Sequence, residues 1–332
     1  MPLQLVYLIQ LLVLSYLQSV TQSARSLRVE DYSVINMLNK RKIKKHIKMN
    51  TFDWINYAFF ALIAIIMIFP FWYVLVGSFS DGLDYMAGGV WLWPRKWSLV
   101  NFKMILNDSR LLIAYRNTIL RVIIGTTTQV LFTSFVAYAM SRSDLPGKKV
   151  FRIINIFTLF FSGGFIPYYL IITSLGLYDS FLVYILPSLY SASNMIILCA
   201  FFKDIPNELH EAAIMDGASE IKIWWTIYMP LSKPIIATVA LWITVGHWNA
   251  YFNTMVFTRN PQLITLQYYL LKVIKESSMP SGDFLTAAEL EQVNSTTVSY
   301  AAIIIATLPI IFVYPYVSRY FLNDLKEGGI KG

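Results

Sequence analysis

Six long stretches without Asp, Glu, Lys or Arg constrain the fold of this chain more than any other feature. Each reaches the roughly 20 residues needed to cross about 30 Å of hydrocarbon. Lipid offers the backbone no hydrogen-bonding partner, so each stretch is expected to be helical. The sequence therefore predicts an all-α integral membrane protein with six transmembrane helices, over residues 55–79, 122–141, 153–178, 180–202, 234–258 and 292–318. The third holds Gly163, Gly164 and Pro167, which predict a break.

Composition supports this class. Hydrophobic residues make up 56% of the 332 residues and charged residues only 14%, against about a quarter in soluble domains. The single cysteine, Cys199, excludes a disulfide within the chain and a cysteine-based metal cluster, and no metal site is expected. No phosphate-binding loop, His-Glu-x-x-His or Gly-x-Ser-x-Gly motif is present, so we expect neither an enzyme nor a chain that binds ATP and Mg²⁺ itself.

The distribution of Lys and Arg predicts the topology. The net charge is +8, and the densest basic cluster, at 40–48, directly precedes the first stretch. The positive-inside rule then places both termini in the cytoplasm of a multi-pass protein of the cell (cytoplasmic) membrane. Arg116 and Arg121, near the outer end of the second stretch, are expected to extend to the membrane interface.

Two segments lie outside the six predicted spans: the N-terminal part of the chain and the outer loop between the fifth and sixth stretches. We divide the chain into an atypical N-terminal extension with a basic cytoplasmic segment, 1–49, and a six-span domain, 50–332. Residues 1–36 lack the basic start of a signal peptide, which leaves a dispensable extension, with Met37 or Met49 as a later start, or an extra anchoring helix. In the outer loop 259–291, a helix lying on the membrane surface is predicted by Leu263, Leu266, Leu270, Leu271 and Ile274.

A short helix is predicted in the cytoplasmic loop between the fourth and fifth stretches. Asp204 and Pro206 suit a helix start, and Gly217 suits the position after a helix that ends near Asp216. About three turns are too short to span a membrane. A short, acidic, amphipathic helix of this kind is suited to a groove on another protein, although a solvated loop helix is the alternative.

The loop also carries a motif. The motif reads Glu211-Ala212-Ala213, three residues, Gly217, nine residues, Ile227, one residue and Met229-Pro230. Its spacing resembles the EAA loop of binding-protein-dependent ABC transporter permeases. That family usually has Leu where this chain has Met229. The six stretches, the Gly163–Pro167 turn and the Trp248-Asn249 pair resemble its carbohydrate-uptake, maltose-permease-like branch over roughly residues 50–332.

The resemblance implies a permease that works with other subunits. It implies ATP-binding ABC subunits, a second permease subunit and an extracytoplasmic solute-binding protein, with ATP and Mg²⁺ bound by the ATPase. The EAA loop would couple ATPase closure to alternating access of a sugar or oligosaccharide importer. By motif position, the coupling residues would be Glu211, Ala212, Ala213, Asp216, Gly217 and Pro230.

The fifth stretch carries polar and aromatic residues within its predicted membrane span. Such residues inside a membrane face a water path or bond to neighbouring helices. The candidates for a substrate path are Thr244, His247, Trp248, Asn249 and Asn253, and interhelical bonding is the equal alternative.

Other functions remain as alternatives at this point. A permease for a peptide or polyol would have the same features. A membrane-embedded enzyme would need a carboxylate or histidine cluster near the end of a span, and a secondary transporter would want an acidic residue within a span. Neither feature is found in the six stretches.

Overall fold

The computed structural model describes residues 51–275, 286, 289 and 292–327, so segment 1–49 lies outside the described residues. The chain divides into two compact units, Met1–Ile65 and Ile66–Gly332. The boundary falls inside α3 (Thr51–Ser78). All other described helices belong to the second unit.

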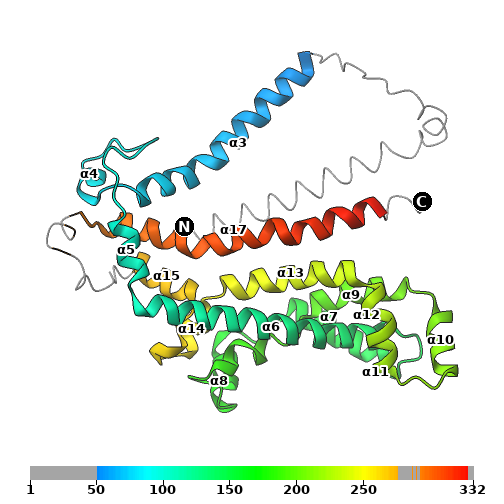
Figure 1. The fold of residues 1–332 in the computed structure, drawn as a ribbon. Helices are drawn as coiled ribbons and strands as arrows, with labels where there is room; N and C mark the ends of the chain where they lie inside the picture. The colour runs from blue at the N-terminus through cyan, green and yellow to red at the C-terminus, as the bar shows by residue number, and fades with distance from the viewer. Residues whose placement is uncertain (1–50, 276–285, 287–288, 290–291, 328–332) are drawn as a thin grey trace. The chain divides into compact units, whose positions relative to one another are not determined.

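All regular elements in the described ranges are helices, and an isolated antiparallel bridge joins Ser80 to Trp97 (Figure 1). After α3 the helices are α4 (Gly82–Met86), α5 (Val100–Leu106), α6 (Ser109–Ser141), α7 (Lys148–Phe160), α8 (Phe165–Ser174), η1 (Phe181–Tyr184), η2 (Leu186–Ser188), α9 (Ala192–Lys203), α10 (Asn207–Met215), α11 (Glu220–Ile223), the π-helix η3 (Trp224–Tyr228), α12 (Met229–Leu231), α13 (Lys233–Asn249), α14 (Phe252–Phe257), η4 (Pro261–Leu263), α15 (Leu266–Lys275) and α17 (Ser295–Glu327).

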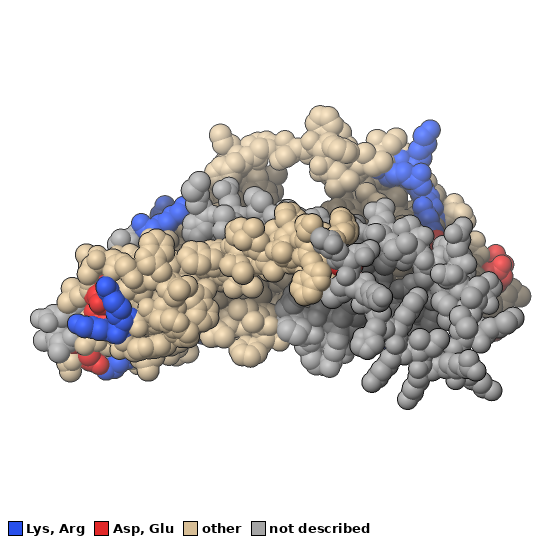
Figure 2. Space-filling model, turned by 90° about the horizontal axis from the view of Figure 1, so that it is seen from above, with Lys and Arg blue, Asp and Glu red and all other residues tan. Residues whose placement is uncertain are grey.

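The all-helical membrane fold is confirmed. Three described helices are long and apolar enough to cross a membrane: Phe52–Ser78, Ser109–Ser141 and Ser295–Phe312. Three bent pairs of helices bring the number of spans to six if each pair counts as one. Few Lys, Arg, Asp or Glu side chains are seen among the described residues on the face in Figure 2, as expected for a protein surrounded by lipid.

The expected break in the third stretch is present. α7 and α8 meet at 116°, and Gly164, between them, has a φ of 84°. Glycine adopts this left-handed conformation without the clash that a Cβ would cause.

The prediction of one continuous helix over residues 180–202 and another over 234–258 is wrong. The first is divided by a bend of 47° between Phe181–Ser188 and Ala192–Lys203. The second ends as an α-helix at Asn249, because Ala250 takes an extended conformation with a ψ of 117°. Apolar composition alone did not indicate these breaks, since neither sequence holds the paired glycines of the third stretch.

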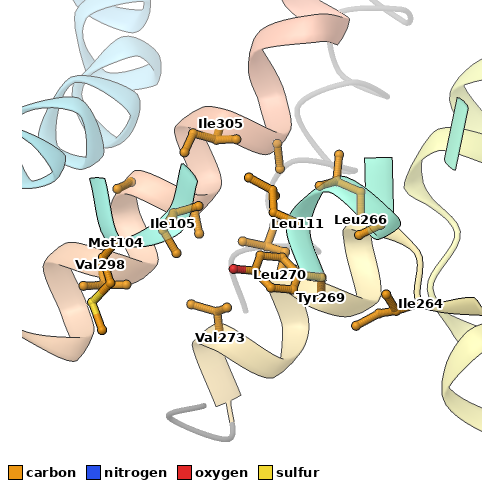
Figure 3. Packing of buried hydrophobic residues seen from close by; sticks show 14 of the residues in the cluster. Met104, Ile105, Leu111, Ile264, Leu266, Tyr269, Leu270, Val273, Val298 and Ile305 are labelled. Atoms are coloured by element: carbon orange, nitrogen blue, oxygen red, sulfur yellow. The ribbon is translucent and has the colours of Figure 1, made fainter. Parts of the chain in front are cut away.

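The long helix α6 forms the axis of the second unit. It lies beside α13 and α9, and near its N-terminus also beside α15 (Figure 1). One hydrophobic cluster surrounds its N-terminal end, where α5, α15 and α17 contribute Ile105, Leu266, Leu270 and Val298 (Figure 3). A second cluster surrounds its C-terminal half and includes Tyr138. The two ends of α6 thus pack into two different hydrophobic clusters.

The predicted amphipathic helix is α15, but its position differs from the expectation. Leu266, Leu270 and Leu271 are buried in the structure. Their neighbours are α6 and α17 of the same chain, so the apolar face of α15 packs against protein (Figure 3). Amphipathic periodicity shows that one face is apolar, and it does not show what covers that face.

Asn101 on α5 connects three segments. Its side chain is fully buried. Nδ2 donates to the backbone oxygens of Ser78 (3.1 Å) and Ser80 (2.9 Å), and Oδ1 accepts from Thr297 Oγ1 (2.9 Å) on α17. These three bonds hold the end of α3 and the start of α17 to α5.

We expect Asn101→Ala to lower the free energy of unfolding by about 2–4 kcal/mol, because it removes the donor to the Ser78 and Ser80 carbonyls and one acceptor of the Thr297 hydroxyl. Thermal unfolding of the detergent-purified chain measures this change. Asn107→Ala, just after the same helix, is the control, because the Asn107 side chain is exposed. Equal melting temperatures for the two variants would show that the Asn101 bonds do not hold the segments together.

Candidate functional site

Helix α10 occupies the position of the predicted short helix. It runs from Asn207 to Met215, with Pro206 before it and Asp216 after it, close to the predicted bounds. One face turns toward the rest of the chain. His210 is fully buried there, and Ala213 is half-buried against the second hydrophobic cluster. Of the two predicted alanines, Ala213 therefore packs within the chain itself.

The opposite face of α10 is open. Glu208, Glu211 and Ala212 are exposed on it, and Met215 is 87% exposed. Further large apolar side chains are exposed on the next turns, at Ile221 and Trp225, with exposed fractions of 64% and 56%. Exposed apolar side chains between carboxylates are the features of a protein-docking helix.

The C-terminus of α10 is a Schellman motif. The N–H of Gly217 donates to Ile214 O (2.9 Å), and the N–H of Ala218 donates to Ala213 O (2.9 Å). Gly217 has a φ of 74°, the left-handed conformation that this motif requires after the helix. Gly217 therefore ends the helix and turns the chain toward α11, while Asp216 remains exposed.

A polar contact that sequence reasoning missed holds α10 to α6. The Tyr138 hydroxyl lies 3.4 Å from His210 Nδ1 and donates a hydrogen bond to Glu220. Glu220 Oε1 in turn lies 3.7 Å from His210 Nε2. The loop is thus fixed at both of its short helices to the C-terminal end of α6. A lone histidine on an acidic helix was the only sequence signal.

The loop returns to the bundle through the π-helix η3 and α12. Ile227 is half-buried, whereas Pro230 is exposed at the start of α12. Trp224 and Tyr228 are buried below them. The motif residues thus lie on one continuous segment, with Glu211, Ala212, Asp216 and Pro230 exposed and Ala213 turned inward.

The substrate-path candidates lie in and after α13, and four have contacts within the chain. Thr244 Oγ1 is 3.2 Å from Thr126 Oγ1 of α6. Asn253 Nδ2 donates to Val183 O (3.1 Å). His247 and Trp248 are buried, and the Trp248 ring meets Tyr115 edge-on. These contacts are those of the interhelical alternative. Asn249 is half-buried at the end of α13.

Arg121 does not extend to the membrane interface, which corrects the expectation. Its side chain is buried, and its guanidinium lies 4.8 Å from the centre of the Tyr184 ring. Nε donates to His247 Nδ1 (3.4 Å) and Nη1 to Ala250 O (3.3 Å). The bond to Nδ1 requires a neutral imidazole with its proton on Nε2. Arg116, by contrast, is exposed.

Gly125 makes this arrangement possible. It is buried on α6 facing α13, and a Cβ placed on it would lie 2.6 Å from His247 Nε2. Only a glycine lets the two helices approach this closely while His247 keeps its place beside Arg121.

No group of three His, Cys, Asp or Glu that could hold a metal ion occurs among the residues with described positions. The candidate site consists of a set of exposed carboxylate and apolar side chains at one end of α6 and a polar seam between α6 and α13.

Comparison with known proteins gives consistent matches. Residues 110–327 match the family of binding-protein-dependent transport system inner membrane components. The chain is 35% identical over 284 residues to protein LplC of Bacillus subtilis, covering 85% of this chain and 95% of that protein. It is 33% identical to the polygalacturonan/rhamnogalacturonan transport system permease protein YtcP of Bacillus subtilis, covering 86% of this chain and 100% of YtcP.

A solved structure is similar as well. It is the crystal structure of a bacterial ABC transporter involved in the import of the acidic polysaccharide alginate, with a TM-score of 0.76 and 33% identity. The match covers 81% of this chain and 96% of the chain in that structure.

We expect Gly125→Ala to destabilise the chain by about 1–3 kcal/mol, because the added methyl group overpacks the seam and displaces His247 from Arg121. Thermal unfolding in detergent measures the effect. The same substitution at Gly246 on α13 is the control, since a Cβ there meets no atom within 4 Å. A Gly125→Ala variant as stable as Gly246→Ala would contradict the close contact.

Proposed function

The chain belongs to the family of binding-protein-dependent transport system inner membrane components, whose members are permeases and not enzymes, and we propose from this that it is the permease subunit of an ATP-driven importer for a sugar or oligosaccharide. YtcP is named for polygalacturonan and rhamnogalacturonan, and the similar solved transporter is described by its import of alginate. These names support a saccharide as the substrate and include acidic ones. An importer of peptides or polyols is the alternative within the same family.

The proposed assembly contains further subunits. Binding-protein-dependent transport implies a solute-binding protein and ATPase subunits, and we place a second permease beside this chain. ATP and Mg²⁺ would be bound by the ATPase. We place the chain in the cytoplasmic membrane with both termini inside, which is supported by the basic cluster at 40–48 and leaves the loop of α10 in the cytoplasm.

The exposed face of α10 carries the proposed coupling. Met215 is 87% exposed beside the carboxylates of Glu208 and Glu211, which is the single observation that most supports docking to an ATPase groove. The contacts of His210 and Glu220 with Tyr138 would pass a movement of the docked helix to α6. Movement of α6 would then alternate the access of the pathway.

We expect Glu211→Lys and Gly217→Pro to leave the chain in the membrane but to weaken its association with the ATPase at least about tenfold. The first reverses a docking charge. The second removes a bonded N–H and imposes a negative φ where 74° is required. Co-purification of the tagged chain from native membranes, together with saccharide uptake, measures both effects.

The matched control is Gly217→Asn, because asparagine tolerates the left-handed conformation at this position. It should keep the ATPase and most of the uptake. Normal uptake by both Glu211→Lys and Gly217→Pro would remove the coupling role from this helix.

If Asn249 lies on the substrate path, its substitution should change saccharide uptake. Asn249 is the one candidate for which no contact with a neighbouring helix is described. We expect Asn249→Ala to lower the rate of saccharide uptake severalfold while protein levels stay normal, because an amide that bonds sugar hydroxyls in the path is lost. Thr244→Val tests the interhelical alternative and should lower thermal stability. Unchanged uptake kinetics in Asn249→Ala would exclude that residue from the path.

A further inference from the structure

The structure contains a pocket that the coupling loop and the polar seam do not use. It has a volume of about 540 Å³ and lies between the N-terminal end of α6, α14, η4 and α15. This volume falls within the range of about 300–1,000 Å³ that is usual for small-molecule sites. Three of its lining residues, Ile264, Tyr269 and Val273, are labelled in Figure 3.

The pocket lies at the end of α6 opposite the coupling loop. Arg110 lines it, whereas Tyr138, which contacts the loop, lies 28 residues later on the same helix. At 1.5 Å per residue the two positions are roughly 40 Å apart, which is the thickness of a membrane. If the loop is cytoplasmic, as proposed above, the pocket opens on the outer side, where substrate arrives.

The lining is basic. Arg110, Arg259 and Lys272 line the pocket, and no Asp or Glu does. Arg110 is compensated by Asp108, which lies 2.9 Å away. Burial raises the pKa of Asp108, but hydrogen bonds from Arg110 and Tyr269 outweigh this and hold the pKa below its ordinary value. Asp108 is therefore a carboxylate at neutral pH, and the pair adds no net charge.

Arg259 and Lys272 are not compensated in this way. Within the part of the chain that is described, no carboxylate lies within ion-pair distance of either side chain. Asp179, which lies between α8 and η1, accepts from the backbone N–H groups of Arg259 (3.0 Å) and Asn260 (2.8 Å). Among the described residues, the two positive charges at this pocket thus have no carboxylate partner, a pattern that favours an anionic ligand.

The remaining walls suit a sugar ring. Lys272 Nζ lies 5.1 Å from the centre of the Tyr268 ring, so a cation and a phenol stand next to each other in the pocket. Tyr268 is half-buried and presents an aromatic surface, and the Thr258 hydroxyl, which donates to Thr254 O (2.8 Å), can still accept a hydrogen bond. An aromatic face beside charge-assisted donors can hold a ring that carries a carboxylate.

We propose that this pocket is a binding site for an acidic saccharide, with Arg259 and Lys272 binding the carboxylate of a uronic acid unit as it enters the permease. The proposal rests on the proposed saccharide import and makes its substrate class narrower. Arg110 is held by Asp108 and shapes the wall. The pocket is a receiving site on the outer side, before the membrane-spanning path.

The test is direct binding to the purified whole transporter in nanodiscs, without the solute-binding protein. Trigalacturonate is the acidic probe, and its fully methyl-esterified form is the matched neutral probe. We expect Arg259→Gln/Lys272→Gln to raise the Kd for trigalacturonate at least about tenfold, since charge-assisted bonds are lost. Binding should weaken with salt, and the neutral probe should bind more weakly to the unmodified transporter.

Lys275→Gln is the control, because Lys275 lies on the same helix, is exposed and does not line the pocket. It should bind trigalacturonate like the unmodified transporter. Equal binding of trigalacturonate by the double variant and the control would overturn the proposal. So would equal binding of both probes by the unmodified transporter.

Saccharide uptake by the complete transporter distinguishes failure of the acidic-saccharide site from failure of the proposed saccharide import. If neutral saccharides are imported and the pocket variants bind as the unmodified transporter does, only the acidic site is wrong. If no saccharide of either kind is imported or bound, the saccharide function and the site are both wrong.

Discussion

The fold depends on the demand that every backbone polar group in lipid finds a partner within the protein. Helices meet this demand along their length, and the bends are where it becomes difficult. Two of the breaks show a local solution. At the bend after α7, Phe161 N–H donates to Phe157 O, and Gly164 N–H donates to Ser162 Oγ. At the bend before α9, the Ser191 hydroxyl accepts from Asn194 N–H. At these two breaks, backbone N–H groups outside the regular helix pattern thus find an acceptor within the chain.

Burying the charge of Arg121 is the second requirement, and among the described residues the seam between α6 and α13 accommodates it without a carboxylate in ion-pair distance. Arg121 has a neutral imidazole, a carbonyl and an aromatic face around it. Such an arrangement satisfies donors of the guanidinium and leaves its charge in place. Gly125 is required for it, since any side chain there would occupy the space of His247. A glycine, a histidine and an arginine from two helices therefore form one unit.

Sequence reasoning predicted what depends on local rules. The six apolar stretches followed from length and charge, and the bounds of α10 followed from Pro206, Asp216 and Gly217, because caps and turns are set by neighbouring residues. It failed where the answer depends on what a side chain meets. Arg121 was expected at the interface and α15 on the membrane surface, since periodicity does not distinguish lipid from protein. The contact of Tyr138 with Glu220 joins residues 82 positions apart, and no local pattern reveals it.

The two ends of α6 differ in charge in a way that limits how they can communicate. Carboxylates of Glu208 and Glu211 are exposed at one end, and Arg259 and Lys272 line the pocket at the other. A separation of roughly 40 Å along the helix is several times the Debye length of about 8 Å at physiological salt. Solvent-exposed charges so far apart are screened from each other. The coupling that we propose between the ends would therefore be mechanical, carried by a helix that packs against its neighbours and contacts the loop through Tyr138.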